Sequence, residues 1–269
     1  MTPKNRRGAD HGAVKRVYYH SHARKTRAGT GSMKTVLSEP FEMVDPMSTR
    51  AEKQSEPRAP EPPDVANDLA VRAAPPELRA EEFELCRLDG LDLGERDASR
   101  VQVSGSRLAH VDLSSSVLKD ATFRDVIVED GSWANVRADG LSLRRVRLER
   151  VRLTGAHLAS AEIHNVTFVD CRIDLAAFRF AKLERVRFES CRMEEVDFYD
   201  ARLESVVFTE SGLVGATWSG ATLTRSEIRG CDLAGARSPE RLRGVRMPWA
   251  DVIGAAGELA AAVGIIVIE

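Results

Sequence analysis

Apolar side chains recur at every fifth position between Leu88 and Leu233. All thirty residues at this spacing are apolar, and most of them are Leu or Phe. The residue two places before each is Ala, Val, Ser, Cys or Gly in twenty-seven of the thirty cases; the exceptions are Leu91, Arg96 and Leu141. The other three positions of each five are mostly polar or charged. Each group of five therefore offers one large and one small side chain to an interior.

A period of five fits neither regular secondary structure. Helices repeat their apolar face at about 3.6 residues and strands at about 2. Leucine-rich repeats have units of about 20 to 29 residues with unequal leucine spacing. A period of five does fit a chain that turns a corner after each short extended segment. Four such sides close a coil of twenty residues, which predicts an all-β solenoid.

In such a coil, residues twenty positions apart should lie in one column. Sorted in this way, the aromatic residues fall into particular columns, and the stacked rings should lie at the strand spacing of about 4.8 Å. Two columns are rich in aromatic residues, and a third is mostly aliphatic. They contain, respectively, Leu148, Phe168, Phe188 and Phe208; Leu158, Phe178, Phe198 and Trp218; and Phe123, Leu143, Ile163, Leu183, Leu203 and Leu223.

Several five-residue segments resemble the A-(D/N)-L-x-x consensus of the pentapeptide-repeat family. They include Val111-Asp-Leu-Ser-Ser, Ala156-His-Leu-Ala-Ser, Ala201-Arg-Leu-Glu-Ser and Cys231-Asp-Leu-Ala-Gly. The resemblance runs without a break over residues 86–235. It implies a right-handed quadrilateral β-helix with no catalytic residues of its own.

Residues 1–76 differ in composition from the repeats. Residues 1–37 carry a net charge of +8, and the proline- and acid-rich residues 38–85 carry −7. Without sustained apolar periodicity, too little surface is available to offset the entropy of ordering, which predicts a disordered tail. The basic run is interpreted as a solvated tail. The alternatives are an arm that touches nucleic acid, or a later start at Met33, Met43 or Met47.

The solenoid is predicted over residues 77–237, and its open ends need caps. Residues Pro76–Glu84 suit a short helical turn over the first coil. A C-terminal helical cap is predicted over residues 238–269. Ser238-Pro-Glu is typical of a helix start, and a second helix is predicted over Trp249–Val263. Ile265–Ile268 could then pair as a terminal strand. A homodimer through this C-terminal segment and a simple cap both remain open.

The overall composition gives no reason to expect nucleic acid or a membrane as a partner. Of 269 residues, 43% are hydrophobic, 6% are aromatic and 30% are charged, and the formal net charge is −2. We expect a cytoplasmic protein, because no apolar segment follows the early basic residues as in a secretory signal. Arg outnumbers Lys 32 to 7, which we interpret as the coding bias of a GC-rich, bacterial genome.

Residues that could support catalysis or metal binding are scattered. The cysteines form no C-x-x-C pair, and Cys171, Cys191 and Cys231 fall in one column of the small inward position. We interpret them as core-filling residues, the alternatives being a metal site or a disulfide between Cys171 and Cys191. No Gly-rich phosphate loop is present. We therefore expect no catalytic, cofactor-binding or metal-binding residues, and not an enzyme.

The outward positions carry the candidate partner-binding residues. Arg152, Arg172 and Arg192 should form a ladder on one wall, with Arg147 and Arg187 on the next. Acids cluster nearby at Glu194, Asp197 and Asp200. Acidic residues beside several of these arginines favour ordinary charge compensation over a basic patch.

Two hypotheses on function follow from the sequence. The first is a non-enzymatic scaffold whose flat walls bind another protein, not nucleic acid directly. The alternative comes from the resemblance, whose best-known activity is mimicry of duplex DNA to modulate DNA gyrase or another topoisomerase. Such mimicry needs a dense acidic surface in place of phosphates, and residues 86–235 carry a net charge of only −3. A continuous acidic strip along one wall would favour the alternative, and a mixed surface would favour the scaffold.

Overall fold

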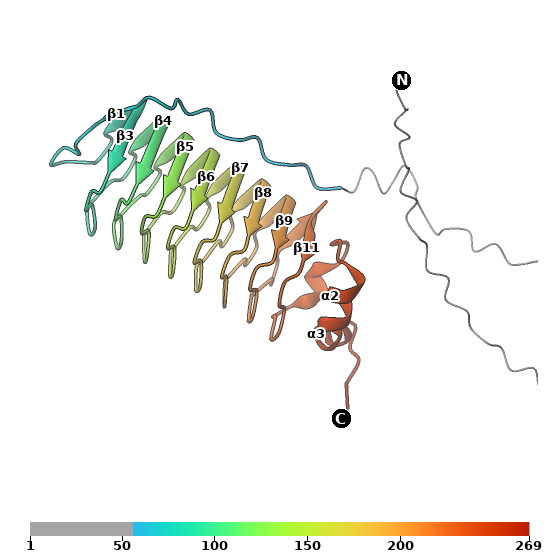
Figure 1. Cartoon of the computed structure of the whole chain (residues 1–269). Helices are drawn as coiled ribbons and strands as arrows, with labels where there is room; N and C mark the ends of the chain where they lie inside the picture. Colours follow the sequence, from blue (N-terminus) through green and yellow to red (C-terminus); the bar gives the residue numbers. More distant parts are fainter. Residues whose placement is uncertain (1–55, 269) are drawn as a thin grey trace, which may run out of the picture. The chain divides into compact units, whose positions relative to one another are not determined.

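The computed structural model describes residues 56–268, and most of this region is a parallel β-solenoid (Figure 1). Eleven strands form one sheet, in which each strand pairs with its neighbour along the solenoid. The long strands are β4 (Gln102–Ala109), β5 (Thr122–Glu129), β6 (Ser142–Glu149), β7 (Glu162–Val169), β8 (Lys182–Glu189) and β9 (Arg202–Thr209). The short strands are β1 (Ala70–Val71), β2 (Glu82–Glu84), β3 (Cys86–Asp89), β10 (Thr222–Thr224) and β11 (Glu227–Arg229).

The register confirms the predicted coil of twenty residues. Ser142 pairs with Glu162 and Leu148 with Phe168, so partners are twenty positions apart. Two further sides of each coil join their neighbours through isolated bridges, such as Arg152 with Arg172 and His157 with Ala177. We number the walls from one coil and extend the names in steps of twenty: wall 1 is residues 141–144, wall 2 is 146–149, wall 3 is 151–154 and wall 4 is 156–159.

Each wall ends at a residue with left-handed backbone. Every position divisible by five from Ala80 to Gly235 has a positive φ, whether or not it is glycine. A single left-handed residue redirects an extended chain, at a cost for L-residues that Gly, Asn and Asp bear best. The period of five therefore has a backbone cause: four residues of wall are followed by one residue of corner.

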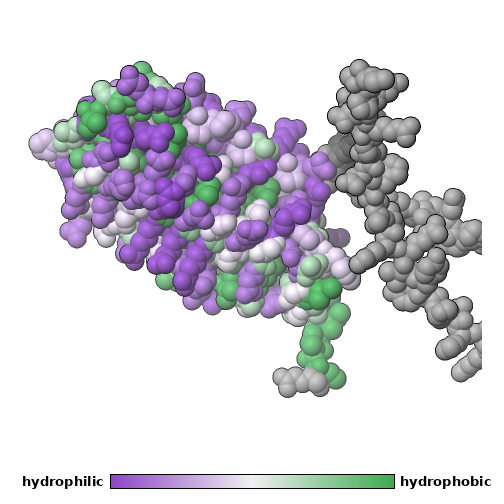
Figure 2. Space-filling view, viewed as in Figure 1, coloured by the Kyte–Doolittle hydropathy of each residue, from purple (hydrophilic) through white to green (hydrophobic). Residues whose placement is uncertain are grey.

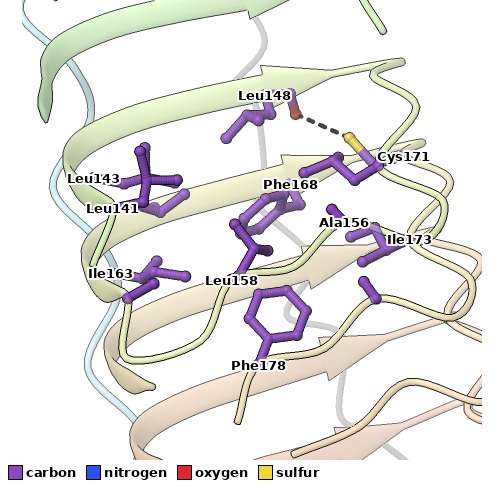
Figure 3. Packing of buried hydrophobic residues seen from close by; sticks show 14 of the residues in the cluster. Leu141, Leu143, Leu148, Ala156, Leu158, Ile163, Phe168, Cys171, Ile173 and Phe178 are labelled. Carbon is purple, nitrogen blue, oxygen red and sulfur yellow. Dashed lines mark hydrogen bonds between the residues drawn. The ribbon is translucent and has the colours of Figure 1, made fainter. Parts of the chain in front are cut away.

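The interior consists of the predicted columns of large side chains. The rings of Phe168, Phe188 and Phe208 are stacked, with centroid distances of 4.8 Å and 5.1 Å. Phe178, Phe198 and Trp218 form a second stack, with centroid distances of 5.3 Å and 4.9 Å. Figure 3 shows Phe168 and Phe178 directed into the interior among aliphatic side chains from the other walls. The solenoid is thus filled by side chains and is not a channel.

At the N-terminal end, the prediction of a helical turn over Pro76–Glu84 is wrong. Leu78 and Phe83 are buried, and β2 pairs in parallel with β4. These two residues lie ten and five positions before Leu88, so they continue the inward period of five. Pairing with β4 outweighs the helix propensity of the acidic residues around them, and the solenoid begins at Leu78.

At the C-terminal end, the predicted helix starts are confirmed and the terminal strand is not. The 3₁₀ helix η1 spans Pro239–Leu242, and Leu242 is buried under the last coil. The helix expected over Trp249–Val263 is two short helices, α2 (Trp249–Gly254) and α3 (Ala256–Ala262), which meet at Ala255. Ile265–Ile268 pairs with no strand and is exposed, as the apolar segment in Figure 2 shows. Arg246 forms the bridge to Glu227 of β11.

Residues 56–76, which the sequence assigns to the tail, lie extended along the solenoid. They include β1, which pairs with β3 through Ala70 and Cys86. Arg96 donates hydrogen bonds to the carbonyl oxygens of Pro75 and Pro76. The segment lacks apolar periodicity because most of it contacts polar corner residues, and only Ala74, near its end, packs against the core. Residues 1–55, and with them the basic run, lie outside the described residues.

Candidate functional site

The arginine ladder predicted on one wall is present on wall 3. Arg152, Arg172 and Arg192 follow one another through consecutive bridges, and all three are exposed. Arg192 forms ion pairs with Asp174 at 3.3 Å and Glu194 at 3.0 Å. Between residues 56 and 268, neither Arg152 nor Arg172 has an ion-pair partner. The charge of Arg192 is therefore neutralised at one end of the ladder, whereas the charges of Arg152 and Arg172 are unpaired within this range.

The two other predicted arginines belong to wall 2 and are paired along the strand. Arg147 contacts Glu149 at 3.2 Å, and Arg187 contacts Glu189 at 3.6 Å. Thr167 separates the two arginines in the ladder of pairs, so they do not form a continuous basic strip. Exposed pairs of this kind contribute little stability, about 0 to 1 kcal/mol. Wall 2 is thus an ordinary mixed-charge surface.

The predicted acidic residues lie beside an apolar patch on wall 4 that the sequence analysis missed. Leu175, Phe180 and Tyr199 are 58%, 53% and 43% exposed, and they are the large apolar residues exposed between Cys86 and Arg237. Leu175 and Phe180 occupy the two corners of wall 4 in one coil, and the rings of Phe180 and Tyr199 meet edge to face at 5.6 Å. We call these three residues the wall-4 patch.

Carboxylates of the next coil border the wall-4 patch. Asp197 bridges Ala177 at the middle of the wall, while Glu195 and Asp200 follow Leu175 and Phe180 by twenty positions. Asp197 is paired with Arg179 at 2.6 Å. Within the described part of the chain, Glu195 and Asp200 have no ion-pair partner, and both are exposed. The patch therefore combines apolar side chains with two free negative charges.

The backbone makes Phe180 an unusual corner residue. Its φ is 60°, in the left-handed region that bulky L-residues rarely adopt. The corner column on either side of it contains Ser160 and Asp200, which tolerate this conformation better. Fold stability thus gains little from a phenylalanine at this position, since its ring is half exposed. A strained residue kept by a fold is a reason to look for a function.

A signal for the wall-4 patch was present in the sequence. Phe180 and Tyr199 stand at outward positions of the five-residue period, where most residues are polar. In the sequence these were single exceptions to the polar pattern. Only the folded coil brings residues 175, 180 and 199 together on one wall. Sequence reasoning had identified Glu194, Asp197 and Asp200 as a cluster, and these do lie around the patch.

The described chain shows how its cysteines and other possible metal ligands are arranged. Among residues 56–268, no group of three or more His, Cys, Asp or Glu could hold a metal ion. The four cysteines are free, and Cys171 and Cys191 are buried in the interior. The contact with Cys171 and burial raise the pKa of the Cys191 thiol, and burial raises that of Cys231. Raised pKa values make the Cys191 and Cys231 thiols poor nucleophiles at neutral pH, whereas the hydrogen bond with Cys191 lowers the pKa of the buried Cys171 thiol.

In residues 56–268, the structure contains no helix of the length and apolar character that a membrane span requires.

Comparison with protein families identifies the repeats. A model described as "Pentapeptide repeat region" matches residues 141–218, and a model of eight copies of the pentapeptide repeat matches residues 203–237. No curated protein matches the chain. The matched residues include β6 to β11, the two ring stacks and the wall-4 patch.

Solved structures similar to this chain include the pentapeptide repeat proteins HetL and Rfr23. HetL, from the cyanobacterium Nostoc sp. strain PCC 7120 and involved in heterocyst differentiation regulation, is 17% identical with a TM-score of 0.29; the match covers 64% of this chain and 90% of HetL. QnrB1, a plasmid-mediated fluoroquinolone resistance protein, is 18% identical with a TM-score of 0.39, over 74% of this chain and 98% of QnrB1. Rfr23, from the cyanobacterium Cyanothece 51142, is 15% identical with a TM-score of 0.11, over 62% and 88% of the two chains. These values carry no information on the partner of this chain.

Proposed function

We propose that this pentapeptide-repeat solenoid is a non-enzymatic scaffold that binds another protein through the wall-4 patch. The observation that carries the proposal is Phe180, an aromatic ring left 53% exposed on a left-handed corner. The left-handed backbone at Phe180 destabilises the fold, and a ring that stays half exposed gains little free energy from burial. Binding a partner would bury the ring and offset that cost.

The chemistry of the patch indicates the kind of partner that it fits. Aromatic side chains at the centre of a patch are the usual anchors of protein interfaces, where they insert into or receive apolar side chains. Glu195 and Asp200 add negative charge at the rim. The matching surface therefore presents an apolar group flanked by Lys or Arg, and rim charges of this kind act mainly on specificity and the rate of association.

Site-specific photo-cross-linking in a lysate of the source cells tests this proposal. A photoreactive amino acid at Ala177, between the two corners, should capture one protein reproducibly. With Phe180→Asn and Tyr199→Ser in the same chain, capture should fall about tenfold or more, because a central aromatic anchor contributes about 2 kcal/mol or more. Asn is chosen since it tolerates the left-handed corner.

A matched control keeps the fold and changes a different wall. Arg152→Ser, on wall 3, and Asp170→Asn, at the corner between walls 2 and 3, alter two exposed residues away from the patch, and they should leave capture unchanged. Equal capture by the patch variant and the wild-type chain, with both shown to be folded, would rule out wall 4 as the docking surface.

Mimicry of DNA toward gyrase is not favoured by the surface. On wall 2, Glu129 is paired with Arg107, and Glu149 and Glu189 are paired with neighbouring arginines. Wall 3 carries the arginine ladder, and Asp197 of wall 4 is neutralised by Arg179. A duplex presents a continuous line of phosphates, and none of these walls is a continuous acidic strip.

Supercoiling by purified gyrase should accordingly be unaffected by this protein, even at a large molar excess. A folded, purified chain titrated into the reaction provides the measurement, with a protein that inhibits gyrase as the positive control. Inhibition at substoichiometric amounts would instead make DNA mimicry the leading hypothesis.

A further inference from the structure

The corner between walls 1 and 2 is covered by the chain's own residues 56–65, which we call the strap. Figure 1 shows this blue segment running past the long strands toward β1. Corner residues under the strap are half-buried or buried, and Asn165 and Ser205 are only 8% and 1% exposed. On the next corner, the equivalent residues Asp170 and Ser190 are exposed. The lower exposure of the corner residues between walls 1 and 2 therefore shows which residues the strap covers.

Two backbone amides of the strap bind corner side chains in register. The amide of Glu61 donates to Oδ1 of Asn165 at 3.3 Å, and the amide of Asp64 donates to Oδ1 of Asp125 at 3.2 Å. The donors are three residues apart, and the acceptors are forty residues, or two coils, apart. Glu56 adds an ion pair with Arg246 at 3.9 Å.

This register is that of a polyproline II helix. Two coils at the strand spacing of about 4.8 Å rise by about 9.6 Å, and three residues of polyproline II rise by about 9.3 Å. Polyproline II also has about three residues per turn, so every third residue should face the corner. Pro57, Pro60 and Pro63 are half-buried, while Arg58 and Glu61 are exposed. A strand would instead bury every second residue.

The corner itself is built as a ladder of two-residue units with the same period. Nε of Arg145 donates to Oδ1 of Asp125 at 2.6 Å, and Nε of Arg185 donates to Oδ1 of Asn165 at 2.7 Å. Each Oδ1 thus accepts from one arginine and from one strap amide. The hydrogen bonds from Arg145 hold the pKa of Asp125 below its usual range, against the effect of burial.

A third unit of the ladder is incomplete. Ser205 and Arg225 continue the two columns, and the same three-residue step along the strap, from Asp64 to Glu61, assigns the amide of Arg58 to this unit. Serine is one atom shorter than asparagine, and in the described chain both Ser205 Oγ and Arg225 Nε are buried without a hydrogen-bond partner. In the other direction the pattern ends, because Leu85 and Gly105 stand forty positions before Asp125 and Arg145. Leu85 has no side-chain acceptor, and Gly105 has no side chain to donate. The ladder therefore extends from Asp125 to Arg225.

We propose that this ladder is a recognition groove for acidic, proline-rich segments in the polyproline II conformation, and that a partner protein's segment binds there by displacing the strap. The groove binds backbone amides at every third residue of its ligand. Arg145 and Arg185 are paired with Asp125 and Glu184, and the positive charge for an acidic ligand comes from Arg124 and Arg144, which are exposed beside the ladder and have no ion-pair partner in the described chain. The strap meets these requirements and acts as a built-in competitor. The groove is separate from the wall-4 patch, so the two surfaces can be tested independently.

Binding of a fluorescein-labelled peptide of residues 56–68 to the full chain, followed by anisotropy, tests the groove. Glu61→Pro and Asp64→Pro in the protein remove both strap amides while keeping the polyproline conformation. We expect this opened variant to bind the peptide at least tenfold more tightly than the wild-type chain does. Ala59→Pro is the matched control, because no hydrogen bond of the Ala59 amide holds the strap in the described structure, and it should behave as wild type.

Changes on the groove and on the peptide separate specific from nonspecific binding. In the opened variant, Asn165→Gly keeps the left-handed corner but removes an acceptor, and should weaken peptide binding about fivefold. A peptide with lysine in place of Glu61, Asp64 and Asp68 should bind at least fivefold more weakly than the acidic peptide. The proposal is overturned if the opened variant does not bind the peptide, if Ala59→Pro opens the groove equally, or if the lysine peptide binds as well.

Ser205 offers a gain-of-binding test. Ser205→Asn in the opened variant supplies the acceptor for Arg225 Nε and the Arg58 amide, and should tighten peptide binding about fivefold. Ser205→Ala is the control and should leave the affinity unchanged. Equal affinity of the Asn and Ala variants would show that the third unit does not take part and would overturn the repeating register.

Discussion

Replacement of Phe188 by alanine is expected to lower the free energy of unfolding by about 3 to 5 kcal/mol, because it removes the centre of a ring stack and leaves a cavity. Phe188 is fully buried, and it stacks on Phe168 at 4.8 Å and on Phe208 at 5.1 Å. Its edge also meets Phe178 of the second stack at 6.3 Å. No other part of the chain can move into the space, since the neighbouring coils are fixed by their own strand pairs.

Urea unfolding followed by circular dichroism gives the measurement. Phe188→Leu keeps most of the volume and should lose less than about 1.5 kcal/mol. Arg187→Ala, which removes an exposed ion pair with Glu189, should change stability by less than about 1 kcal/mol. A loss of the same size in all three variants would contradict a stability dominated by the ring stacks.

Deletion of the single corner residue Asp130 should be as damaging as the loss of a core ring. A wall that lacks its fifth residue cannot bring Trp133 and Val136 to their inward positions without straining a corner. Both side chains are fully buried, and each contributes about 2 kcal/mol. We expect a loss of about 4 kcal/mol or more, seen as a lower urea midpoint or as loss of cooperative unfolding.

Deletion of the whole coil 131–150 provides the control. It removes twenty residues, yet Asp130 then joins Val151 in the correct register, and Leu113 meets Leu153 in the same column. Because a solenoid behaves as a sum of neighbouring repeats, the shortened chain should still fold cooperatively. If the one-residue deletion proved better tolerated than the twenty-residue deletion, the argument that coil register determines stability would be wrong.

The interior could be predicted from the sequence because its pattern is local and repeated. Positions such as Phe168 and Phe188 occur every twenty residues, so their stacking follows from counting along the chain. The same counting placed Arg152, Arg172 and Arg192 in one ladder, as the structure confirms. Near residues 76–84, where the pattern weakens, helix propensity gives the wrong prediction, because the parallel pairing of Phe83 with Val103 decides the conformation.

The candidate binding surfaces were only partly predictable. The acids Glu194, Asp197 and Asp200 were recognised as a cluster, but Leu175, Phe180 and Tyr199 were not recognised as a patch. Their importance depends on exposure and on the left-handed φ of the corners. Neither quantity can be read from residue types alone, since a buried and an exposed phenylalanine look the same in a sequence.

The sequence by itself determined the coil, its columns and its fully packed interior, because each inward residue interacts mainly with residues at fixed multiples of five. The tertiary structure alone decided where the strap lies, how the ends are capped and which apolar side chains stay exposed. The amide of Glu61 meets Asn165 across 104 positions of the chain, through a backbone contact that leaves no mark in the residue pattern. Such contacts arise because the distance between corner acceptors two coils apart matches the rise of three residues in an extended, proline-rich segment.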